Sequence, residues 1–353
     1  MTSDPSANPG ARAAAPPPIG ISLGDPAGIG PEIVVKALAA RPGLPVRVYG
    51  DPAVLDATAA ALGLALLRRD QIRAVEAPRG EPRAGVGAGA VDIVPGRPNL
   101  ASAAAQLAAL EAATDAALRG EIGALCTAPI SKDWIARVGF AFPGHTEYLA
   151  HRARVEDFAM MLAGPRLRVI LATTHIALGD VATALTAETI ARVTVLGART
   201  LAGSFGLARP RVAVSGLNPH AGEAGRFGDE EARIVAPAIA AARTRLAALG
   251  CPAELSGPHP PDTVFRQAAL GRYDAVVALY HDQGLIPVKL IHFDEAVNVT
   301  LGLPFVRTSP DHGTAYDIAG TNRADPSSFL AALDLAARLG ALGRDRLPDD
   351  PVA

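Results

Sequence analysis

Residues 273–284 read Tyr-Asp-Ala-Val-Val-Ala-Leu-Tyr-His-Asp-Gln-Gly, an apolar run followed directly by polar residues. The run 275–279 predicts a short strand that is buried on both faces, as in a parallel sheet. Such a strand presents His281 and Asp282 where the backbone leaves the sheet. The stretch therefore predicts an α/β fold with a chemical site at the end of a strand.

Two other apolar runs end in the same way. The run 168–174 leads to His175, and the run 211–219 leads to His220. Together with His281, these two histidines would bring three imidazoles to one end of a sheet. Three imidazoles would suit Zn²⁺ or a similar divalent ion and leave one coordination position open. The alternative is that each histidine only hydrogen-bonds to a backbone carbonyl, because the long spacings form no local ligand motif.

The bulk composition narrows the class of protein. A chain of 353 residues exceeds one ordinary hydrophobic core, so two domains are expected. The net charge of −2, without clusters of Lys or Arg, indicates a small-molecule partner and neither nucleic acid nor an anionic membrane. The 2 cysteines favour a reducing compartment, and we expect the cytoplasm. Residues 1–18 resemble a disordered tail without a secretory signal, and no apolar stretch is long enough to span a membrane, so we expect a soluble protein.

Alternating strand and helix patterns predict a parallel sheet with helices on both faces. Strands are predicted at 19–23, 46–49, 91–94, 124–127, 168–174, 211–219, 275–279, 288–290 and 296–300. Helices are predicted at 31–38, 52–67, 102–118 with Ser102 as its cap, 147–152, 187–205, 229–249, 263–270 and 327–342.

A glycine-rich turn at 24–30 (Gly-Asp-Pro-Ala-Gly-Ile-Gly) joins the first strand to the first helix. Backbone N–H groups at a helix N-terminus after such a turn, here around Gly28 and Gly30, can bind an anion. Glycines in a tight strand-to-helix turn are equally well explained by steric need. The turn alone does not distinguish the two.

Several polar residues in loops could bind a phosphate or a carboxylate. Lys132, His145 and Thr146 offer a cation and donors, although Thr146 as a helix cap is the favoured interpretation. Asp262 likewise has the position of a helix cap.

Lys289 and Arg307, with Asn298 between them in sequence, supply two cations and an amide. They could grip a phosphate, with the arginine binding in a bidentate manner. The alternative is a surface ion pair with Asp294 or Glu295. A metal beside such a pair of cations would suggest a small phosphorylated substrate.

Seven stretches in order resemble the 4-hydroxythreonine-4-phosphate dehydrogenase family of pyridoxal phosphate biosynthesis. They are 24–32 (Gly-Asp-Pro-Ala-Gly-Ile-Gly-Pro-Glu), 127–132 (Thr-Ala-Pro-Ile-Ser-Lys), 144–147 (Gly-His-Thr-Glu), 173–175 (Thr-Thr-His), 216–223 (Gly-Leu-Asn-Pro-His-Ala-Gly-Glu), 280–283 (Tyr-His-Asp-Gln) and 297–320. The resemblance covers nearly all of the chain after the tail.

The resemblance implies a homodimer of two-domain α/β/α subunits, similar to isocitrate and isopropylmalate dehydrogenases, with the active site in the interdomain cleft at the dimer interface. Residues 19–128 plus 303–353 would form the first domain. Residues 129–302 would form the second, which carries the metal ligands and the dimer interface.

The resemblance also implies roles for individual residues. His175, His220 and His281 would hold a divalent metal (Zn, Mg or Co) shared across the interface, where His281 would complete the active site of the neighbouring subunit. Substrate contacts would be His145, Thr146, Lys289, Asn298 and Arg307. NAD or NADP would bind at Gly28 and Gly30 and at His312, Gly313, Thr314, Ala315 and Asp317. Asp262 and Asp282 are candidates for the general base by position only.

The reaction implied is the oxidation of 4-phosphohydroxy-L-threonine to 2-amino-3-oxo-4-phosphohydroxybutanoate, which decarboxylates to 3-amino-2-oxopropyl phosphate. Similar enzymes act on threonate or erythronate 4-phosphate, or on a cis-dihydrodiol of an aromatic acid, and Lys289 and Arg307 favour a phosphate. The alternatives from other classes are a metal-dependent hydrolase or lyase that uses the three histidines without a nucleotide, and a non-catalytic sensor of a phosphorylated metabolite.

Overall fold

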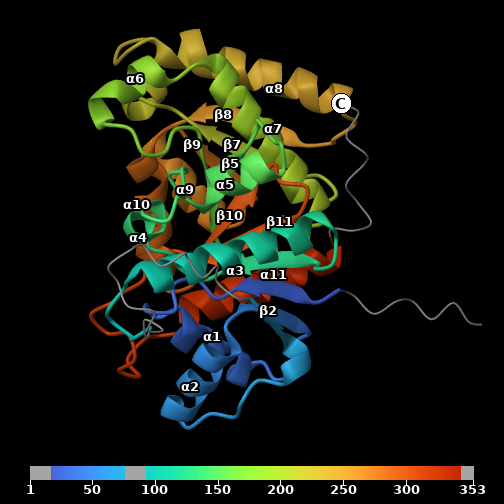
Figure 1. Cartoon of the computed structure of the whole chain (residues 1–353). Helices are drawn as coiled ribbons and strands as arrows, with labels where there is room; N and C mark the ends of the chain where they lie inside the picture. The colour runs from blue at the N-terminus through green and yellow to red at the C-terminus, as the bar shows by residue number, and fades with distance from the viewer. Residues whose placement is uncertain (1–16, 76–92, 343–353) are drawn as a thin grey trace, which may run out of the picture.

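The computed structural model of the chain describes residues 17–75 and 93–342 (Figure 1). Nearly all of the predicted tail and the first half of the strand predicted at 91–94 lie outside these ranges. Of the second half, Val94 forms only an isolated bridge with Arg97. Figure 1 shows an elongated molecule with α2 at one end and α8 at the other.

Within the described ranges, 11 strands form one continuous sheet in the order β3-β2-β1-β4-β11-β10-β5-β6-β9-β7-β8. The strands are β1 (Ile19–Ser22), β2 (Val46–Gly50), β3 (Ile72–Ala74), β4 (Ala124–Thr127), β5 (Ala159–Ala163), β6 (Arg168–Leu171), β7 (Arg211–Ser215), β8 (Glu254–His259), β9 (Ala275–Ala278), β10 (Val297–Leu301) and β11 (Val306–Pro310). Because this sheet runs through both predicted domains, their boundaries remain a prediction.

The sheet is mixed rather than parallel, which corrects the sequence-based expectation. β10 runs antiparallel to both of its neighbours, β11 and β5, and β5 also runs antiparallel to β6. Short connections join β5 to β6 and β10 to β11, and short connections permit antiparallel pairs without a crossover helix. All other neighbouring strands are parallel.

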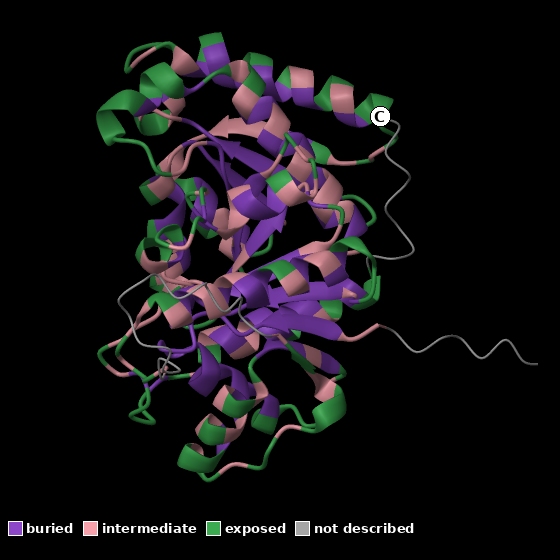
Figure 2. Cartoon of the chain, in the orientation of Figure 1, coloured by how far each residue is buried: buried purple, intermediate pink, exposed green. Residues whose placement is uncertain are grey.

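Helices cover both faces of the sheet, which confirms the α/β class (Figure 2). α1, α7, α8 and α11 pack on one face, while α3, α4 and α5 pack on the other beside α9 and α10. The helices are α1 (Gly30–Ala40), α2 (Pro52–Leu62), α3 (Leu100–Leu118), α4 (Lys132–Ala136), α5 (His145–Arg152), α6 (Val181–Ala184), α7 (Ala187–Gly203), α8 (Ala236–Ala248), α9 (Pro261–Ala269), α10 (His281–His292) and α11 (Ser327–Leu342). Shorter 3₁₀ turns lie at Arg69–Gln71, Leu178–Asp180 and Pro219–Gly222, and a π-helical turn lies at Glu231–Val235.

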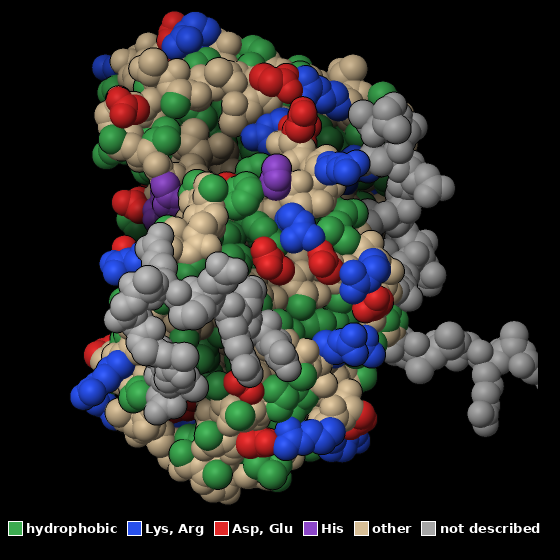
Figure 3. All heavy atoms as spheres, in the orientation of Figure 1, with side chains coloured by type: hydrophobic (Ala, Val, Ile, Leu, Met, Phe, Trp, Pro, Cys, Tyr) green, Lys and Arg blue, Asp and Glu red, His purple; other side chains and the backbone are tan. Residues whose placement is uncertain are grey.

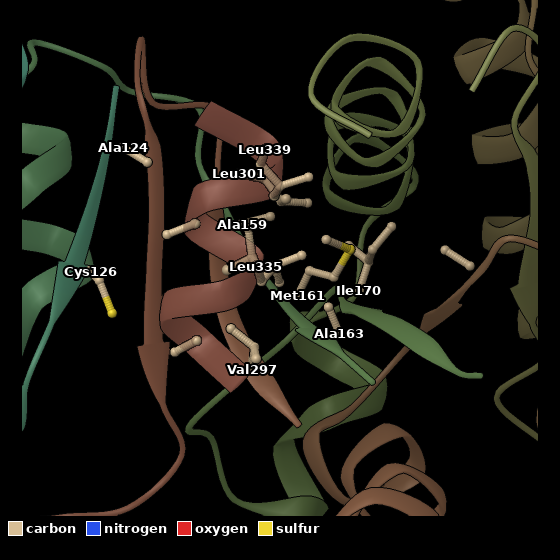
Figure 4. Packing of buried hydrophobic residues seen from close by; sticks show 14 of the residues in the cluster. Ala124, Cys126, Ala159, Met161, Ala163, Ile170, Val297, Leu301, Leu335 and Leu339 are labelled. Carbon is tan, nitrogen blue, oxygen red and sulfur yellow. The ribbon is translucent and has the colours of Figure 1, made fainter. Parts of the chain in front are cut away.

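The antiparallel centre of the sheet is held by α11. Leu335 and Leu339 of this helix belong to the same buried cluster as Leu301 of β10 and Met161 of β5 (Figure 4). Each of these side chains is at most 7% exposed. The two parallel halves of the sheet are therefore joined by a packed apolar layer.

Some predicted elements have different ends or a different type. The helix predicted at 52–67 ends at Leu62, because Gly63 adopts a left-handed conformation with φ of 64°. The third helix is capped by Asn99, and Ser102 completes its capping box from inside the helix. The strand predicted at 288–290 is wrong: these residues lie in α10, where Val288 is buried and Leu290 is 85% exposed. An apolar-polar-apolar triplet is too short to separate the strand period from the helix period.

No single helix in the described ranges is long and apolar enough to cross a membrane. The two neighbouring helical segments Leu178–Ala184 and Ala187–Gly203 are together long and apolar enough, but the chain bends by 92° between them.

Candidate active site

A buried arginine lies where β4, β11 and β10 meet. Arg307 of β11 is 3% exposed; its Nη2 donates to Thr127 Oγ1 of β4 at 2.7 Å and its Nη1 donates to Thr300 Oγ1 of β10 at 3.2 Å. The strand register places the three side chains on one face of the sheet. Burial lowers the pKa of Arg307 to about 10, so the guanidinium stays charged at neutral pH. The fold therefore provides a fixed cation inside the protein.

Three buried polar atoms near this cation have no hydrogen-bond partner among the described residues: Arg307 Nε, Asn298 Oδ1 and His145 Nε2. Asn298 lies on β10 opposite Ser309, two residues from Thr300 and so on the same face. Buried polar groups are normally paired, and unpaired ones are expected where a ligand binds. The three atoms therefore indicate a site for a polar, anionic ligand.

His145 is neutral in this environment. Its pKa lies well below the ordinary value, first because burial disfavours the charged ring and then because Arg307 and Lys132 are positively charged. His145 is also the first residue of α5, whose N-cap is Gly144. The interpretation of Thr146 as a helix cap is thus wrong, since Thr146 lies inside the first turn.

Lys289 does not pair with Asp294 or Glu295, the partners considered from sequence. Its Nζ lies 2.7 Å from Asp311 Oδ2, directly after β11. Glu295 instead contacts His292 at 3.2 Å. The ion pair attaches α10 to the end of the strand that carries Arg307, so Lys289 lies at this end of the sheet but is already bound to a carboxylate.

The glycine-rich turn and the 312–317 loop dock on each other. Ile29 N donates to Thr314 O at 2.9 Å, and a Cβ on Gly28 would lie 2.9 Å from the same oxygen. A Cβ on Gly30 would lie 2.5 Å from Leu23 O. Side chains at both glycines would collide with backbone, which supports the steric explanation of the turn. In the 312–317 loop, Ala315 has φ of 41°, and His312, Gly313 and Asp317 are exposed.

A buried carboxylate that sequence reasoning missed fastens these loops. Asp25 Oδ2 accepts hydrogen bonds from Tyr316 Oη at 2.5 Å and from Gln106 Nε2 at 3.2 Å, and Asp25 Oδ1 accepts from Ala27 N at 2.8 Å. Burial, followed by the bond to Asp25, raises the pKa of Tyr316 to about 12. The sequence feature that could have indicated this buried carboxylate was Gln106, a polar residue on the buried face of the helix predicted at 102–118.

The strands that carry the three histidines lie side by side. β6, β9 and β7 are adjacent and parallel, as the sequence predicted. The rings of His175 and His281 have centroids 5.6 Å apart, whereas His220 lies on the turn Pro219–Gly222 and its ring packs against Phe227 at 6.3 Å. In residues 17–75 and 93–342, no group of three or more His, Cys, Asp or Glu side chains is arranged to hold a metal ion. One chain thus brings two of the three histidines together.

The two candidate bases line the same groove, and one of them contacts the histidine pair. Asp282 Oδ1 is 2.7 Å from His281 Nδ1, which leaves Nε2 of His281 for a ligand. Asp262 is not a helix cap, because α9 begins at Pro261 after Pro260. Both aspartates are exposed and line one groove between α9 and α10.

That groove has a volume of about 630 Å³ and an apolar wall. Of the lining residues, Leu270, Ile286 and Leu290 are 69%, 64% and 85% exposed; Phe293, directly after α10, is 74% exposed. Large exposed apolar patches mark interaction surfaces. On the face drawn in Figure 3, acidic and basic side chains are interspersed with apolar ones.

Comparisons with known proteins identify the family. Residues 44–336 match the family described as "Pyridoxal phosphate biosynthetic protein PdxA". A 4-hydroxythreonine-4-phosphate dehydrogenase from Desulfosudis oleivorans is 49% identical over 334 residues, which cover 91% of this chain and 95% of the relative. The crystal structure of the Klebsiella pneumoniae enzyme of that name has a TM-score of 0.78 at 41% identity, covering 92% of this chain and 99% of that one.

A solved terephthalate 1,2-cis-dihydrodiol dehydrogenase from Burkholderia xenovorans is a more distant relative. It has a TM-score of 0.65 at 32% identity, covering 91% of this chain and 98% of that one. The family match extends over the strands that carry the buried arginine, the histidine pair and most of the described fold. The chain therefore belongs to the PdxA family of pyridoxal phosphate biosynthetic proteins.

Proposed function

We propose that the protein is an NAD(P)-dependent 4-hydroxythreonine-4-phosphate dehydrogenase. It oxidises 4-phosphohydroxy-L-threonine to 2-amino-3-oxo-4-phosphohydroxybutanoate, which decarboxylates to 3-amino-2-oxopropyl phosphate, on the route to pyridoxal 5'-phosphate. The observation that carries this proposal is the alignment of relatives with that name along nine-tenths of the chain, at 49% identity for the Desulfosudis oleivorans protein.

The substrate phosphate binds at the buried arginine. Arg307 offers a charged guanidinium with an unpaired Nε, and His145 offers an unpaired Nε2. A planar guanidinium binds phosphate oxygens in a bidentate manner, and its partners Thr127 and Thr300 fix its orientation. Thr146, Asn298 and Lys289 complete the proposed substrate contacts.

The nicotinamide cofactor binds at the docked loops. We assign it to the turn around Gly28 and Gly30 and to His312, Gly313, Thr314, Ala315 and Asp317. The hydrogen bond from Ile29 to Thr314 supports this assignment, because it brings the two loops into one surface beside the strand that carries Arg307. NAD and NADP both remain candidates.

A divalent metal ion is held by His175 and His281, whose rings lie together in one chain, and we therefore assign His220, rather than His281, to the second copy of the chain. The pair fits such an ion, since imidazole suits Zn²⁺ and Co²⁺ better than Mg²⁺, which prefers oxygen ligands. Asp282 orients His281. An ion at this place supplies Lewis-acid chemistry, which lowers the pKa of an alcohol and stabilises developing negative charge. Because Asp282 is engaged with His281, we assign the general base to Asp262.

The active form is a homodimer. The exposed apolar side chains of α10 continue from the helix end that carries His281, so a second copy seated on them would reach the histidine pair. Leaving these side chains in water is unfavourable, and burial in an interface removes that cost. The two cysteines are free thiols, which agrees with a cytoplasmic location.

The test is NADH or NADPH production from 4-phosphohydroxy-L-threonine, with and without a chelator. Threonate 4-phosphate, erythronate 4-phosphate and the cis-dihydrodiol of terephthalate serve as competing substrates. We expect the first substrate to have the highest kcat/KM and the chelator to abolish turnover. Binding of the phosphorylated substrate without reduction of either nucleotide would sink the proposal in favour of a sensor, and hydrolysis or cleavage without nucleotide would favour a hydrolase or lyase.

A further inference from the structure

The turn that carries His220 has an unusual backbone. Directly after β7, four residues other than glycine adopt positive φ: His220 (53°), Ala221 (53°), Glu223 (41°) and Ala224 (57°). Residues other than glycine are strained in this conformation, which persists only where surrounding contacts enforce it. Other parts of the protein must therefore hold this turn in place.

Glu231 makes those contacts. Its side chain enters from the π-helical turn Glu231–Val235, and the residue is 6% exposed. Oε1 accepts hydrogen bonds from Leu217 N and Asn218 N, both at 2.8 Å, and Oε2 accepts one from Asn218 Nδ2 at 3.0 Å. Burial alone would raise the pKa of Glu231, but the hydrogen bonds from Asn218 and Leu217 outweigh it and the pKa is lowered. The carboxylate is therefore ionised and bound on both oxygens.

Two glycines leave room for this carboxylate. A Cβ on Gly222 would lie 2.6 Å from Glu231 Oε2, and one on Gly216 would lie 3.2 Å from Glu231 Oε1. These glycines stand at the two ends of the segment 216–222, with His220 between them. The segment thus wraps around the Glu231 side chain.

Gln283 ties the same segment to the histidine pair. Its Nε2 donates to Gly216 O at 2.8 Å, and its Oε1 accepts from Leu279 N at 2.7 Å. Gln283 is 8% exposed and lies two residues after His281 in α10. The start of the His220 turn is therefore fixed relative to the strand end that presents His281.

We propose that Glu231 is a positioning residue: it fixes the strained turn so that His220 is presented to the metal ion as a ligand. Gln283 fixes the start of this turn against α10 of its own chain, and from this turn His220 would reach the ion held by the second copy. The identity of the bound ion rests on the proposed function, whereas the holding of the turn does not. Groups that orient metal ligands typically change metal affinity by about 10- to 100-fold when they are removed.

The experiment compares Glu231→Ala and Glu231→Gln with wild type and with Asp274→Asn as a matched control. Asp274 also accepts a backbone hydrogen bond, from Arg211 N at 2.7 Å, but at the opposite end of β7 from His220. Co²⁺ is the probe, because its visible spectrum reports ligand number and its titration gives a dissociation constant. Amide hydrogen exchange of residues 216–224 is measured on the metal-free protein.

We expect Glu231→Ala to weaken Co²⁺ binding by about 10-fold or more and to speed exchange in 216–224. Glu231→Gln should have Co²⁺ affinity and exchange rates between those of wild type and Glu231→Ala. Its side-chain carbonyl oxygen can still accept hydrogen bonds from two backbone amides, but its NH₂ group faces the NH₂ group of Asn218. If Glu231→Ala does not fold, the comparison of Glu231→Gln with wild type tests the proposal. Asp274→Asn should lower the melting temperature and leave Co²⁺ affinity unchanged.

Two outcomes overturn the proposal: a Glu231→Ala protein with wild-type Co²⁺ affinity and spectrum, or unchanged exchange in 216–224. A wild-type protein that binds no Co²⁺ would instead remove the metal from the proposed function. In that case the exchange rates alone decide whether Glu231 holds the turn.

Discussion

The buried arginine and the histidine pair illustrate two ways of building a site. Arg307 is held by side chains from two neighbouring strands of its own chain and is almost fully buried. His175 and His281 stand at exposed strand ends beside an uncovered apolar groove, and His220 lies on a separate turn. The first region is built from one chain, whereas we propose that the second is half of a site shared with a second copy. The predictions below separate these two regions.

The strongest effect is expected from mixing inactive subunits. His281→Ala and His220→Ala homodimers should each lose nearly all activity, because a ligand is missing from every site. If His220 comes from the other subunit, random exchange should restore about a quarter of wild-type NADH production, since half of the dimers are hybrids with one intact site of two.

The matched control mixes His281→Ala with His175→Ala. These two residues lie together in one chain, so no hybrid contains an intact site and activity should stay at the baseline. Equal rescue in both mixtures would contradict the grouping of His175 with His281 in one chain and would make His281 the ligand from the other subunit. No rescue in either mixture would contradict a site shared between subunits.

Arg307→Lys tests the region that is built from one chain. Lysine cannot donate to Thr127, Thr300 and a phosphate in the same planar arrangement. We expect kcat/KM for the phosphorylated substrate to fall by about 100- to 1000-fold, because lysine keeps the charge but loses the paired hydrogen bonds of the buried guanidinium. Arg211→Lys is the control, because Arg211 pairs with Asp274 on a partly exposed edge. A folded Arg307→Lys enzyme with wild-type kcat/KM would remove Arg307 from the substrate site.

Leu290→Ser tests whether a second copy covers α10. Leu290 is 85% exposed in one chain, and losing its burial in an interface should raise the dimer dissociation constant by about 10- to 100-fold, or roughly 1.5–3 kcal/mol. Analytical ultracentrifugation over a concentration series measures the shift. Leu66→Ser is the control, since Leu66 is 58% exposed but lies in the loop after α2, at the other end of the molecule (Figure 1). Identical dissociation constants for the two variants would place the interface elsewhere.

The smallest effect concerns pH and His145. Its pKa is lowered in the folded state, so below the ordinary histidine pKa the unfolded chain binds a proton at this residue that the folded chain does not bind. This contribution to stability is present above the ordinary histidine pKa of about 6.5 and is lost as pH falls toward the folded value, by at most about 1.4 kcal/mol per pH unit. Urea unfolding of wild type and His145→Gln at pH 7.5 and pH 5 should show a smaller loss in the variant. Equal losses of stability in the two proteins would mean that burial and the charge of Arg307 do not lower the pKa of His145.

Local sequence patterns predicted the elements that depend on neighbouring residues. The apolar run at 124–127 and the helix pattern at 327–342 match β4 and α11 to the residue, because burial and helical periodicity are both local properties there. β5 was not predicted, and the triplet 288–290 was assigned to the wrong type, because short segments show no clear period.

The same contrast applies to the candidate site. The sequence alone placed His175, His220 and His281 after apolar runs, and its motifs indicated a family that the comparisons confirm. Only the tertiary structure decided which polar groups meet. It joined Arg307 to Thr127 across 180 residues, gave Lys289 the partner Asp311, and set His220 on a turn fixed by Glu231.

The physical reason is the range of the interactions. Turns, caps and strand ends depend on residues a few positions apart, so the types and spacing of these residues predict them. A buried hydrogen bond between distant strands depends on sheet order and register, which arise only when the whole sheet packs. The sequence by itself thus determined the parts and the family of this protein, and tertiary packing decided which of those parts form a site.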